Sequence, residues 1–157
     1  MKIRAYQHDD LTNIVSLFYD AVHSIPSSDY SADQLEAWAP ESERNAVTER
    51  LRKAFSANIV RVAEGRDGIM GFCDMTSQGY LDHMYVGSSF QRKGTAGALL
   101  RELEKSAEEL GVSRITTDAS ITARPFFEKS GFHVLQPRIA ERQGVQLKNF
   151  RMHKILV

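Results

Sequence analysis

This sequence of 157 residues is short of several features that mark particular classes of protein. It has one cysteine, Cys73, which excludes an internal disulfide and is compatible with a reducing cytosol. No apolar run reaches the ~18 residues of a membrane-spanning helix, and the N-terminus lacks the apolar core of a signal peptide. Twenty basic and twenty acidic residues cancel, which argues against a nucleic-acid partner because a basic face would be needed to neutralise phosphates. We therefore expect a cytoplasmic protein with neither a membrane nor a nucleic-acid partner.

Metal-ligand patterns are also missing from the sequence. The five histidines are scattered, and no cysteine or histidine cluster has metal-ligand spacing. The single thiol of Cys73 falls in an apolar strand-like segment, Ile69-Met70-Gly71-Phe72-Cys73, which favours packing over reactivity. We expect no metal.

The chain length and the 42% apolar content suit one globular domain, which we place over residues 1–157. Hydrophobic periodicity, capping residues and turn signals predict the order β-α-α-α-β-β-β-α-β-α-β-β. A meander followed by one βαβ crossover predicts an α/β fold: a mixed sheet with helices on both faces. The expected strands are 2–6, 59–64, 69–77, 80–86, 114–119, 132–136 and 145–156. The expected helices are 9–22, 32–38, 44–55, 95–110 and 122–130, and a polar loop is expected over 137–144.

The most informative segment runs from Val86 to Leu100, where a strand ends and a small basic loop opens into a helix. Gly94, Ala96 and Gly97 have little or no side chain, so a ligand can approach the backbone closely. The first amides of a helix lack intrahelical acceptors and lie at the positive end of its dipole. This geometry binds phosphate, and the loop is interpreted as a pyrophosphate cradle.

Two common phosphate loops do not fit this segment. A P-loop needs Lys followed by Ser or Thr after its last glycine, whereas Gly97 is followed by Ala98 and Leu99. A dinucleotide fold needs three glycines after an early strand, and this loop has two, past the middle of the chain. A nucleotide-binding regulatory domain is therefore the weakest of three functional hypotheses.

The remaining pattern, Gln91-x-x-Gly94-x-Ala96, resembles the coenzyme A loop of the GNAT superfamily of N-acetyltransferases. The preceding strand, residues 80–86, and the segment 123–132 (ARPFFEKSGF) are similar to two further signatures of that superfamily, in the right order and separation. Residues 144–152 resemble an uncharacterised bacterial branch of it. The resemblance covers the chain from about residue 57 onward.

This resemblance implies acetyl transfer from acetyl-CoA to a primary amine of a small molecule or peptide, by direct attack on the thioester. It implies that the strand before the loop and the strand after the loop's helix run parallel and diverge, with pantetheine between them. The amide of Met84 or Tyr85 would stabilise the developing oxyanion. The residues expected to contact the cofactor are Met84, Tyr85, Val86, Gln91, Arg92, Lys93, Gly94, Thr95, Ala96, Gly97, Ser120 and Phe127.

An amine is mostly protonated at neutral pH, so the reaction needs a base. Asp82 and His83 lie on the strand that meets the thioester, and strand alternation places them on opposite faces, so that one of them should face the cleft. His83 has the better unperturbed pKa for this role, whereas Asp82 would need a raised pKa or a water relay. The choice between these two residues and water stays open.

The acceptor site is less specified by the sequence. Tyr30 and Trp38, in the N-terminal third, are expected to line it, and Asp29 and Glu36 are considered as attractants for a cationic amine.

The sequence departs from the family at Phe127, where many members have a tyrosine that protonates the departing thiolate. Water, Ser120 or Thr122 would replace that acid, or the protein would be a non-catalytic acetyl-CoA-binding module or sensor. A monomer and a homodimer are both compatible with the sequence.

Overall fold

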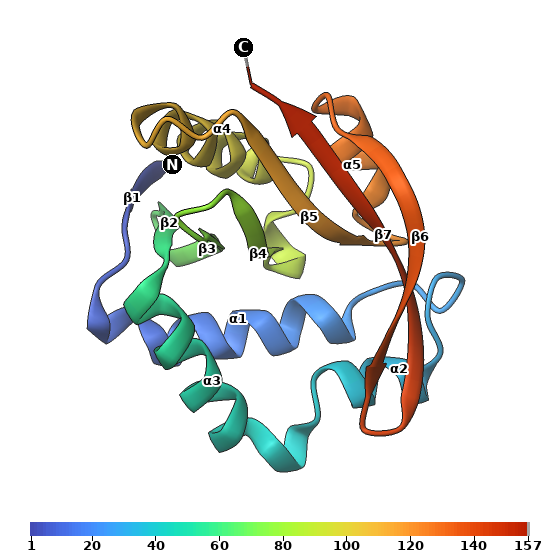
Figure 1. Ribbon diagram of the computed structural model, residues 1–157. Coiled ribbons are helices and arrows are strands. Elements are labelled where there is room, and N and C mark those ends of the chain that lie inside the picture. The colour runs from blue at the N-terminus through green and yellow to red at the C-terminus, as the bar shows by residue number, and fades with distance from the viewer. Residues whose placement is uncertain (157) are drawn as a thin grey trace.

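The computed structural model describes residues 1–156, and its elements follow the predicted order (Figure 1). The strands are β1 (Lys2–Ala5), β2 (Ile59–Gly65), β3 (Gly68–Met75), β4 (Tyr80–Val86), β5 (Arg114–Ser120), β6 (His133–Arg142) and β7 (Val145–Ile155). The α-helices are α1 (Leu11–His23), α2 (Ala32–Trp38), α3 (Arg44–Ala57), α4 (Thr95–Glu109) and α5 (Arg124–Lys129). Short 3₁₀ segments occupy His8–Asp10, Glu41–Glu43 and Ser88–Phe90.

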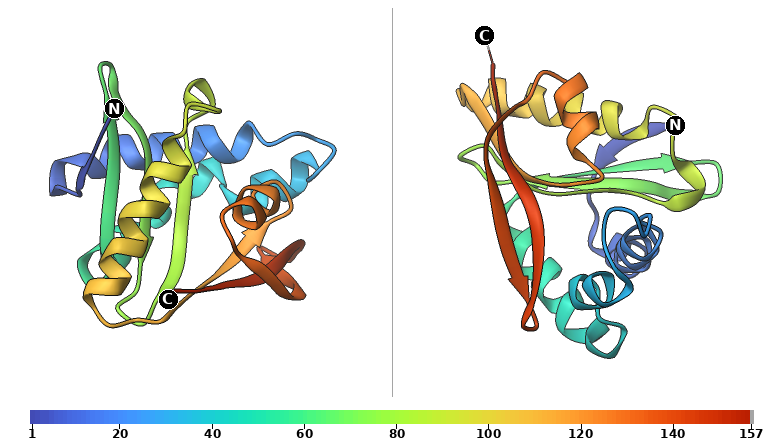
Figure 2. Two further views of the ribbon diagram at one scale, coloured as in Figure 1. Left: turned by 90° about the horizontal axis from the view of Figure 1, so that it is seen from above. Right: turned by 90° about the vertical axis from the view of Figure 1, so that its right-hand side faces the viewer.

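Within the described residues the strands form one 7-stranded sheet in the order β1-β2-β3-β4-β5-β7-β6. Only the β4–β5 pair in this order is parallel, and its neighbours pair antiparallel. Figure 2 shows α4 on one face of the sheet and α1 with α2 and α3 on the other. The predicted mixed sheet with helices on both faces is therefore confirmed.

Each face of the sheet has its own apolar core. Ile14, Phe18 and Leu51 come from the helices α1 and α3 and pack with Phe72 on one side. Leu99 and Leu103 of α4 pack with Ile115 on the other. The helical spacing of these side chains produces both layers because only one stripe of each helix faces the sheet.

The parallel strands β4 and β5 pair only at their beginnings. Tyr80 lies opposite Thr116 and Leu81 opposite Thr117, and no further pair follows along these two 7-residue strands. Beyond Leu81 the strands diverge, as predicted, and the backbone edge of β4 faces an opening in the middle of the sheet. Both cavities described below lie beside this opening.

The end of the chain differs from the prediction. The polar loop expected over 137–144 is instead part of a long hairpin, in which β6 continues to Arg142 and β7 starts at Val145. The prediction was wrong because the polar character of this segment was taken to indicate a loop. Pro137 is tolerated because β6 is the outermost strand of the sheet. Gln143 and Gly144 both have positive φ, 50° and 75°, which suits a two-residue hairpin turn.

None of the helices found in residues 1–156 has both the length and the apolar character that crossing a membrane requires.

Candidate active site

The loop before α4 is held in place by side chains from two elements. The side-chain amide of Gln91 donates to the Val86 carbonyl at 2.9 Å. Asp20 of α1 accepts from the backbone N–H of Ser88 at 2.8 Å and from its hydroxyl at 2.9 Å. Arg92 and Gly94 adopt left-handed backbone conformations, with φ of 60° and 78°. A left-handed non-glycine residue is uncommon and costs ~1–2 kcal/mol, so the surrounding contacts fix this loop.

The first turn of α4 has free backbone donors. Its first hydrogen bond runs from the Ala98 N–H to the Gly94 carbonyl at 3.0 Å. No acceptor within residues 1–156 is bonded to the backbone N–H groups of residues 92–97. The hydroxyl of Thr95 is also buried without a partner in this part of the chain. A Cβ built on Gly94 would meet no atom within 4 Å, so the space in front of these donors is open.

A first cavity of about 420 Å³ extends from this loop along the opening between β4 and β5. Of the residues expected to contact the cofactor, all except Lys93 line it. The Lys93 ammonium instead lies 5.9 Å from the centroid of the Phe90 ring. An arm bound at the loop would therefore run beside Met84 and Val86 toward Asp82 and Ser120.

The backbone of β4 directs one of the two candidate amides into this cavity. The Gly87 N–H donates to the Met70 carbonyl of β3, and backbone groups alternate in direction along a strand. The N–H of Tyr85, which lies opposite Phe72, therefore faces β3. The N–H of Met84 faces the opening, as does the Val86 carbonyl that Gln91 binds. Of the pair Met84 and Tyr85, only Met84 presents its amide to the opening.

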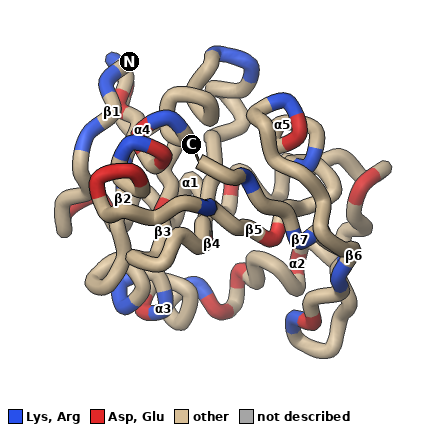
Figure 3. Tube along the Cα trace, turned by 45° about the horizontal axis from the view of Figure 1, so that its top comes forward, with Lys and Arg blue, Asp and Glu red and all other residues tan. Residues whose placement is uncertain are grey.

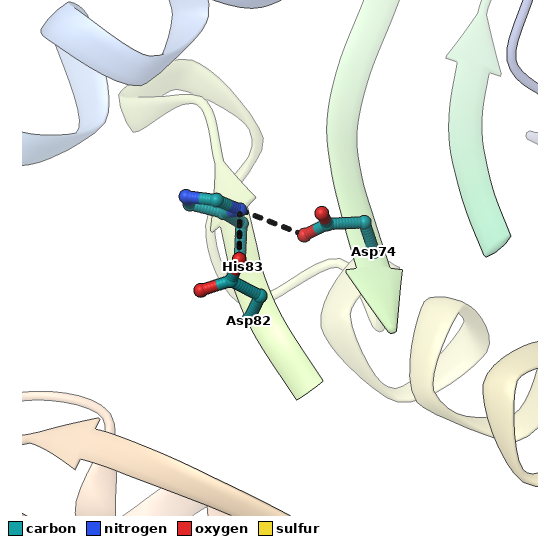
Figure 4. Close-up of side chains that lie close together, drawn as sticks. All are labelled: Asp74, Asp82 and His83. Atoms are coloured by element: carbon teal, nitrogen blue, oxygen red, sulfur yellow. Dashed lines mark hydrogen bonds and ion pairs between the residues drawn. The ribbon is translucent and has the colours of Figure 1, made fainter. Parts of the chain in front are cut away.

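A cluster of titratable side chains on β3 and β4 comprises the buried Asp74, the partly buried His83 and the exposed Asp82 (Figure 4). His83 Nδ1 is 2.8 Å from Oδ1 of Asp74 on β3 and 3.7 Å from Oδ2 of Asp82. Asp74 is fully buried, and its second oxygen accepts from the side-chain amide of Asn58 at 2.9 Å. Asp74 thus holds Nδ1 of the imidazole, and Nε2 is left to face a ligand.

Asp82 and His83 do not lie on opposite faces of the sheet, and the expectation that they would was wrong. Asp74 pairs with His83 and Met75 pairs with Leu81, so Asp82 is one extra residue in β4. This irregularity is a β-bulge, which turns successive side chains to the same side and often occurs beside active sites. The alternation rule fails at this one position, and both side chains line the same cavity.

The cluster has opposing effects on the pKa of His83. Burial lowers the pKa of this imidazole, but the hydrogen bond that it donates to Asp74 and the charges of Asp74 and Asp82 outweigh burial, so the net pKa lies above its usual value. Burial also raises the pKa of Asp82. The pKa values of both groups are therefore raised, and perturbed pKa values are common at functional sites.

A second cavity, of about 590 Å³, lies on the side of β4 that carries this cluster. Tyr30 and Trp38, the two residues expected at the acceptor site, both line it. The hydroxyl of Tyr30 is already bonded to the Lys148 carbonyl and the Ile121 N–H, so only its ring is free to contact a ligand. Trp38 donates its indole N–H to the Tyr85 hydroxyl at 3.2 Å. Asp29 and Glu36 line neither cavity.

The two cavities meet along a shared wall. Five residues border both of them: Trp38, Asp82, Tyr85, Asp118 and Ser120. This wall contains one of the two candidate bases and stands at the open edge of β4. A group held in one cavity can therefore reach a group held in the other.

Phe127, Thr122 and Ser120 differ in their ability to donate a proton or hydrogen bond to a departing thiolate. Phe127 is buried, packs edge-on to Phe126 and Phe132, and lines the first cavity with a ring that cannot donate a proton. The Thr122 hydroxyl donates to Asp29 at 2.7 Å. Ser120 accepts from the Ala123 N–H at 3.0 Å, which leaves its own proton free. Ser120 is the better placed donor.

Sequence reasoning missed Asp74 and Asn58. Asp74 follows Phe72 and Cys73 in a predicted buried strand, and an acidic residue inside such a run was the available signal. A charge at a core position needs a partner. The identity of that partner depends on the register between β3 and β4, which the sequence does not specify.

Comparison with known proteins agrees with this geometry. The acetyltransferase (GNAT) domain family matches residues 26–154. The uncharacterised N-acetyltransferase YafP of Escherichia coli (strain K12) is 36% identical over 152 residues, which cover 97% of this chain and 94% of YafP.

Solved structures give the same result. The GCN5-related N-acetyltransferase of Rhodopseudomonas palustris superimposes with a TM-score of 0.92 at 26% identity, covering 99% of this chain and 95% of that one. The PaiA N-acetyltransferase of Thermoplasma acidophilum, solved in complex with coenzyme A, shares the fold with a TM-score of 0.76 at 19% identity, covering 98% of each chain.

The chain belongs to the GNAT family of acetyltransferases, and the resemblance drawn from the loop and strand motifs is confirmed. It is an N-acetyltransferase of mixed α/β fold.

Proposed function

We propose that this enzyme transfers the acetyl group of acetyl-CoA to a primary amine of a small molecule or peptide, by direct attack on the thioester. The observation that carries the proposal is the junction of the two cavities at the bulged strand β4. One cavity begins at free helix amides, and the other is lined by His83, whose imidazole is bonded to the buried Asp74. The first cavity takes its residues mainly from the middle of the chain and the second from both ends, which supports a single catalytic domain over residues 1–157.

The residues of the first cavity fit a pyrophosphate with an attached arm. The free amides of residues 92–97 lie at the positive end of α4, and Arg92 adds charge beside them. The unpartnered hydroxyl of Thr95 offers a further donor. Bound acetyl-CoA would supply the activated acetyl group. A nucleoside triphosphate would need a lysine directly after the last glycine of the loop, and Ala98 follows Gly97 here.

The chain's own residues would then share the chemistry. The Met84 N–H would stabilise negative charge on the thioester oxygen. His83, oriented by Asp74, would accept the proton of the amine. Its raised pKa makes it a stronger base, and it acts once pH exceeds that pKa. The Ser120 hydroxyl would donate a hydrogen bond to the thiolate, which is already a fair leaving group because a thiol has a pKa of ~8.5 and which would take its proton from water.

A covalent route through the enzyme is not favoured. Cys73 is fully buried, its thiol faces the Leu99 carbonyl, and burial raises its pKa well above the usual range. It lines neither cavity. Direct attack by the amine is therefore the simpler route.

The test separates binding from turnover. We expect coenzyme A to raise the Tm of the wild type, whereas NAD and ATP do not, and we expect the substitution Gly94→Glu to abolish the shift through bulk and charge. Gly111→Glu, at another left-handed glycine with open space around it, is the matched control and should keep the shift.

Turnover is measured as release of free thiol from acetyl-CoA across a library of amines. His83→Gln should retain the coenzyme A shift and lose ~10²-fold or more in kcat/KM. Wild-type protein that binds coenzyme A but releases no thiol above hydrolysis with any amine would instead be an acetyl-CoA-binding module, the alternative that Phe127 suggests. A Tm response to NAD or ATP alone would overturn both readings.

A further inference from the structure

The second cavity is bordered by arginine side chains as well as by the amine-accepting groups of β4. Arg50 of α3 and Arg138 and Arg142 of β6 line it together with Asp82 and His83. Figure 3 marks the basic positions on α3 and on β6. We infer that the acceptor is a small amine that also bears an anionic group, a carboxylate or phosphonate, which these three arginines bind. The amine part of this inference rests on the proposed function.

The register of the terminal hairpin directs two of these arginines to the cavity. Arg138, Ala140 and Arg142 alternate along β6 and therefore share one face. Their partners across the ladder include Leu147, which is buried in the core near α2. The face with Leu147 is thus the inner face of the hairpin, where it approaches the helices (Figure 1).

The three guanidinium groups lack acidic partners in the part of the chain that the structure describes. No carboxylate of residues 1–156 lies within 4.0 Å of Arg50, Arg138 or Arg142. Some other arginines of the described residues do have carboxylate partners, for example Arg4 with Asp10 and Arg151 with Asp118. Guanidinium groups stay charged at any physiological pH and match a carboxylate or phosphonate with two parallel hydrogen bonds. Three unpaired cations around one cavity therefore favour an anion.

The same cavity has acceptors for an amine. Asp82 and His83 both line it from β4, and Asp82 also forms part of the wall shared with the first cavity. Oδ1 of Asn149, which also lines the second cavity, is buried without a hydrogen-bond partner in the described residues. A ligand N–H would satisfy it. The cavity thus offers acceptors on β4 and β7 and cations on α3 and β6.

The arginines also act electrostatically on the reacting groups. Burial raises the pKa of Asp82, and the charges of Arg50 and Arg142 oppose that rise. The volume of about 590 Å³ suits a small molecule rather than a protein surface. An amino acid or aminophosphonate combines both required groups at this size.

The experiment compares anionic amines with matched neutral ones. The probes are glycine, 4-aminobutyrate and phenylalanine, each beside its amide, and 2-aminoethylphosphonate beside ethanolamine. Binding is measured by calorimetry in the presence of coenzyme A, which requires no turnover, and kcat/KM is measured with acetyl-CoA. At least one anionic probe should bind about tenfold or more tightly than its neutral partner.

Three arginine variants locate the anion. Arg50→Gln, Arg138→Gln and Arg142→Gln should each weaken the anionic probe, with a rise in KM and little change in kcat, and leave the neutral partner unaffected. Arg66→Gln, in the exposed β2–β3 turn, is the matched control and should change neither.

Each result decides the inference. Absence of binding by every anionic probe, equal binding of the two partners, or a preference that survives all three substitutions would overturn the anion site. Arginine-dependent binding without thiol release would keep the anion site and remove the proposed reaction. Thiol release that is equal for acids and amides would keep the reaction and remove the anion site.

Discussion

At the scale of single residues, the hydrogen bond between Asp74 and His83 connects the buried core to the proposed catalytic base. Asp74 accepts from the imidazole with one oxygen and from Asn58 with the other, so both of its oxygens are occupied inside the core. A buried carboxylate with these partners fixes the tautomer and the orientation of the histidine. It also keeps a positive charge on His83 to higher pH than in a free histidine.

The substitution Asp74→Asn tests this role. Burial alone lowers the pKa of His83, so loss of the negative partner should move the acid limb of kcat/KM against pH toward lower pH. The plateau should fall about tenfold or more because Asn58 then faces an amide instead of a carboxylate, and the histidine loses its fixed orientation. The amine's own ionisation is common to both enzymes.

The control for this change is Asp67→Asn in the exposed β2–β3 turn, which should leave the profile unchanged. If the Asp74 variant had the same acid limb as the wild type and only a lower stability, the role of Asp74 would be structural. Asp82 or water would then be the better candidate for the base.

Single residues also show where sequence reasoning stopped. The loop residues Gln91, Gly94 and Ala96 were identifiable because their chemistry depends on local backbone, which short patterns encode. Asp74 and the shared direction of Asp82 and His83 were not, because a bulge depends on how two strands align. The cavity arginines Arg138 and Arg142 were hidden for a related reason: their segment was read as a loop.

At the scale of elements, the close packing of α4 on the sheet positions the helix amides. Gly71 of β3 lies under the first turns of α4. A Cβ on it would stand 2.9 Å from the Tyr85 carbonyl and 3.2–3.3 Å from side-chain atoms of Thr95 and Leu99. The absence of a side chain at Gly71 therefore sets how near the helix start lies to β4.

Gly71→Ala should push the start of α4 away from the sheet. We expect a loss of ~1–3 kcal/mol in the free energy of unfolding, as for other overpacked sites, together with weaker binding of coenzyme A by calorimetry. Gly111→Ala, whose Cβ would meet nothing within 4 Å, should lose stability through its positive φ while keeping its affinity for coenzyme A. Equal affinity in both variants would show that α4 tolerates the methyl group without moving its amides.

At the scale of the whole molecule, the order of elements and both helical layers followed from periodicity and capping. Ser31 and Gln34, for example, form a capping box at the start of α2. The prediction was wrong at β6, because a polar segment expected to be a loop pairs with β7. As the outermost strand of the sheet, β6 accepts a proline that an inner strand would not. The sequence therefore did not predict the full extent of the pairing between β6 and β7.

Global stability should depend on acid through Asp10, which joins β1 to the start of α1. The hydrogen bonds from Arg4 hold the pKa of Asp10 below its usual value against the effect of burial. A carboxyl with a lowered folded-state pKa stabilises the fold above its unfolded pKa of ~3.9, and this contribution is lost as pH falls through the folded value.

Asp10→Asn should therefore lower the Tm at pH 7 by several degrees, since ~1 kcal/mol corresponds to ~2–4 °C at this chain length. The difference from the wild type should shrink as pH falls below ~3.9 and through the lowered pKa of Asp10, as measured by thermal melts followed by circular dichroism. Asp9→Asn, at an exposed neighbour, serves as the reference. A difference that is constant with pH would mean that packing, rather than charge, stabilises this junction.

The division of labour between the two cavities has an implication for redesign. Helix α3 and the terminal hairpin line only the second cavity, proposed to hold the amine, whereas the loop before α4 lines only the first, proposed to hold the thioester. Exchanging the hairpin for one of another length or charge would re-target the enzyme to different amines, while the half that activates the acyl group stays as it is.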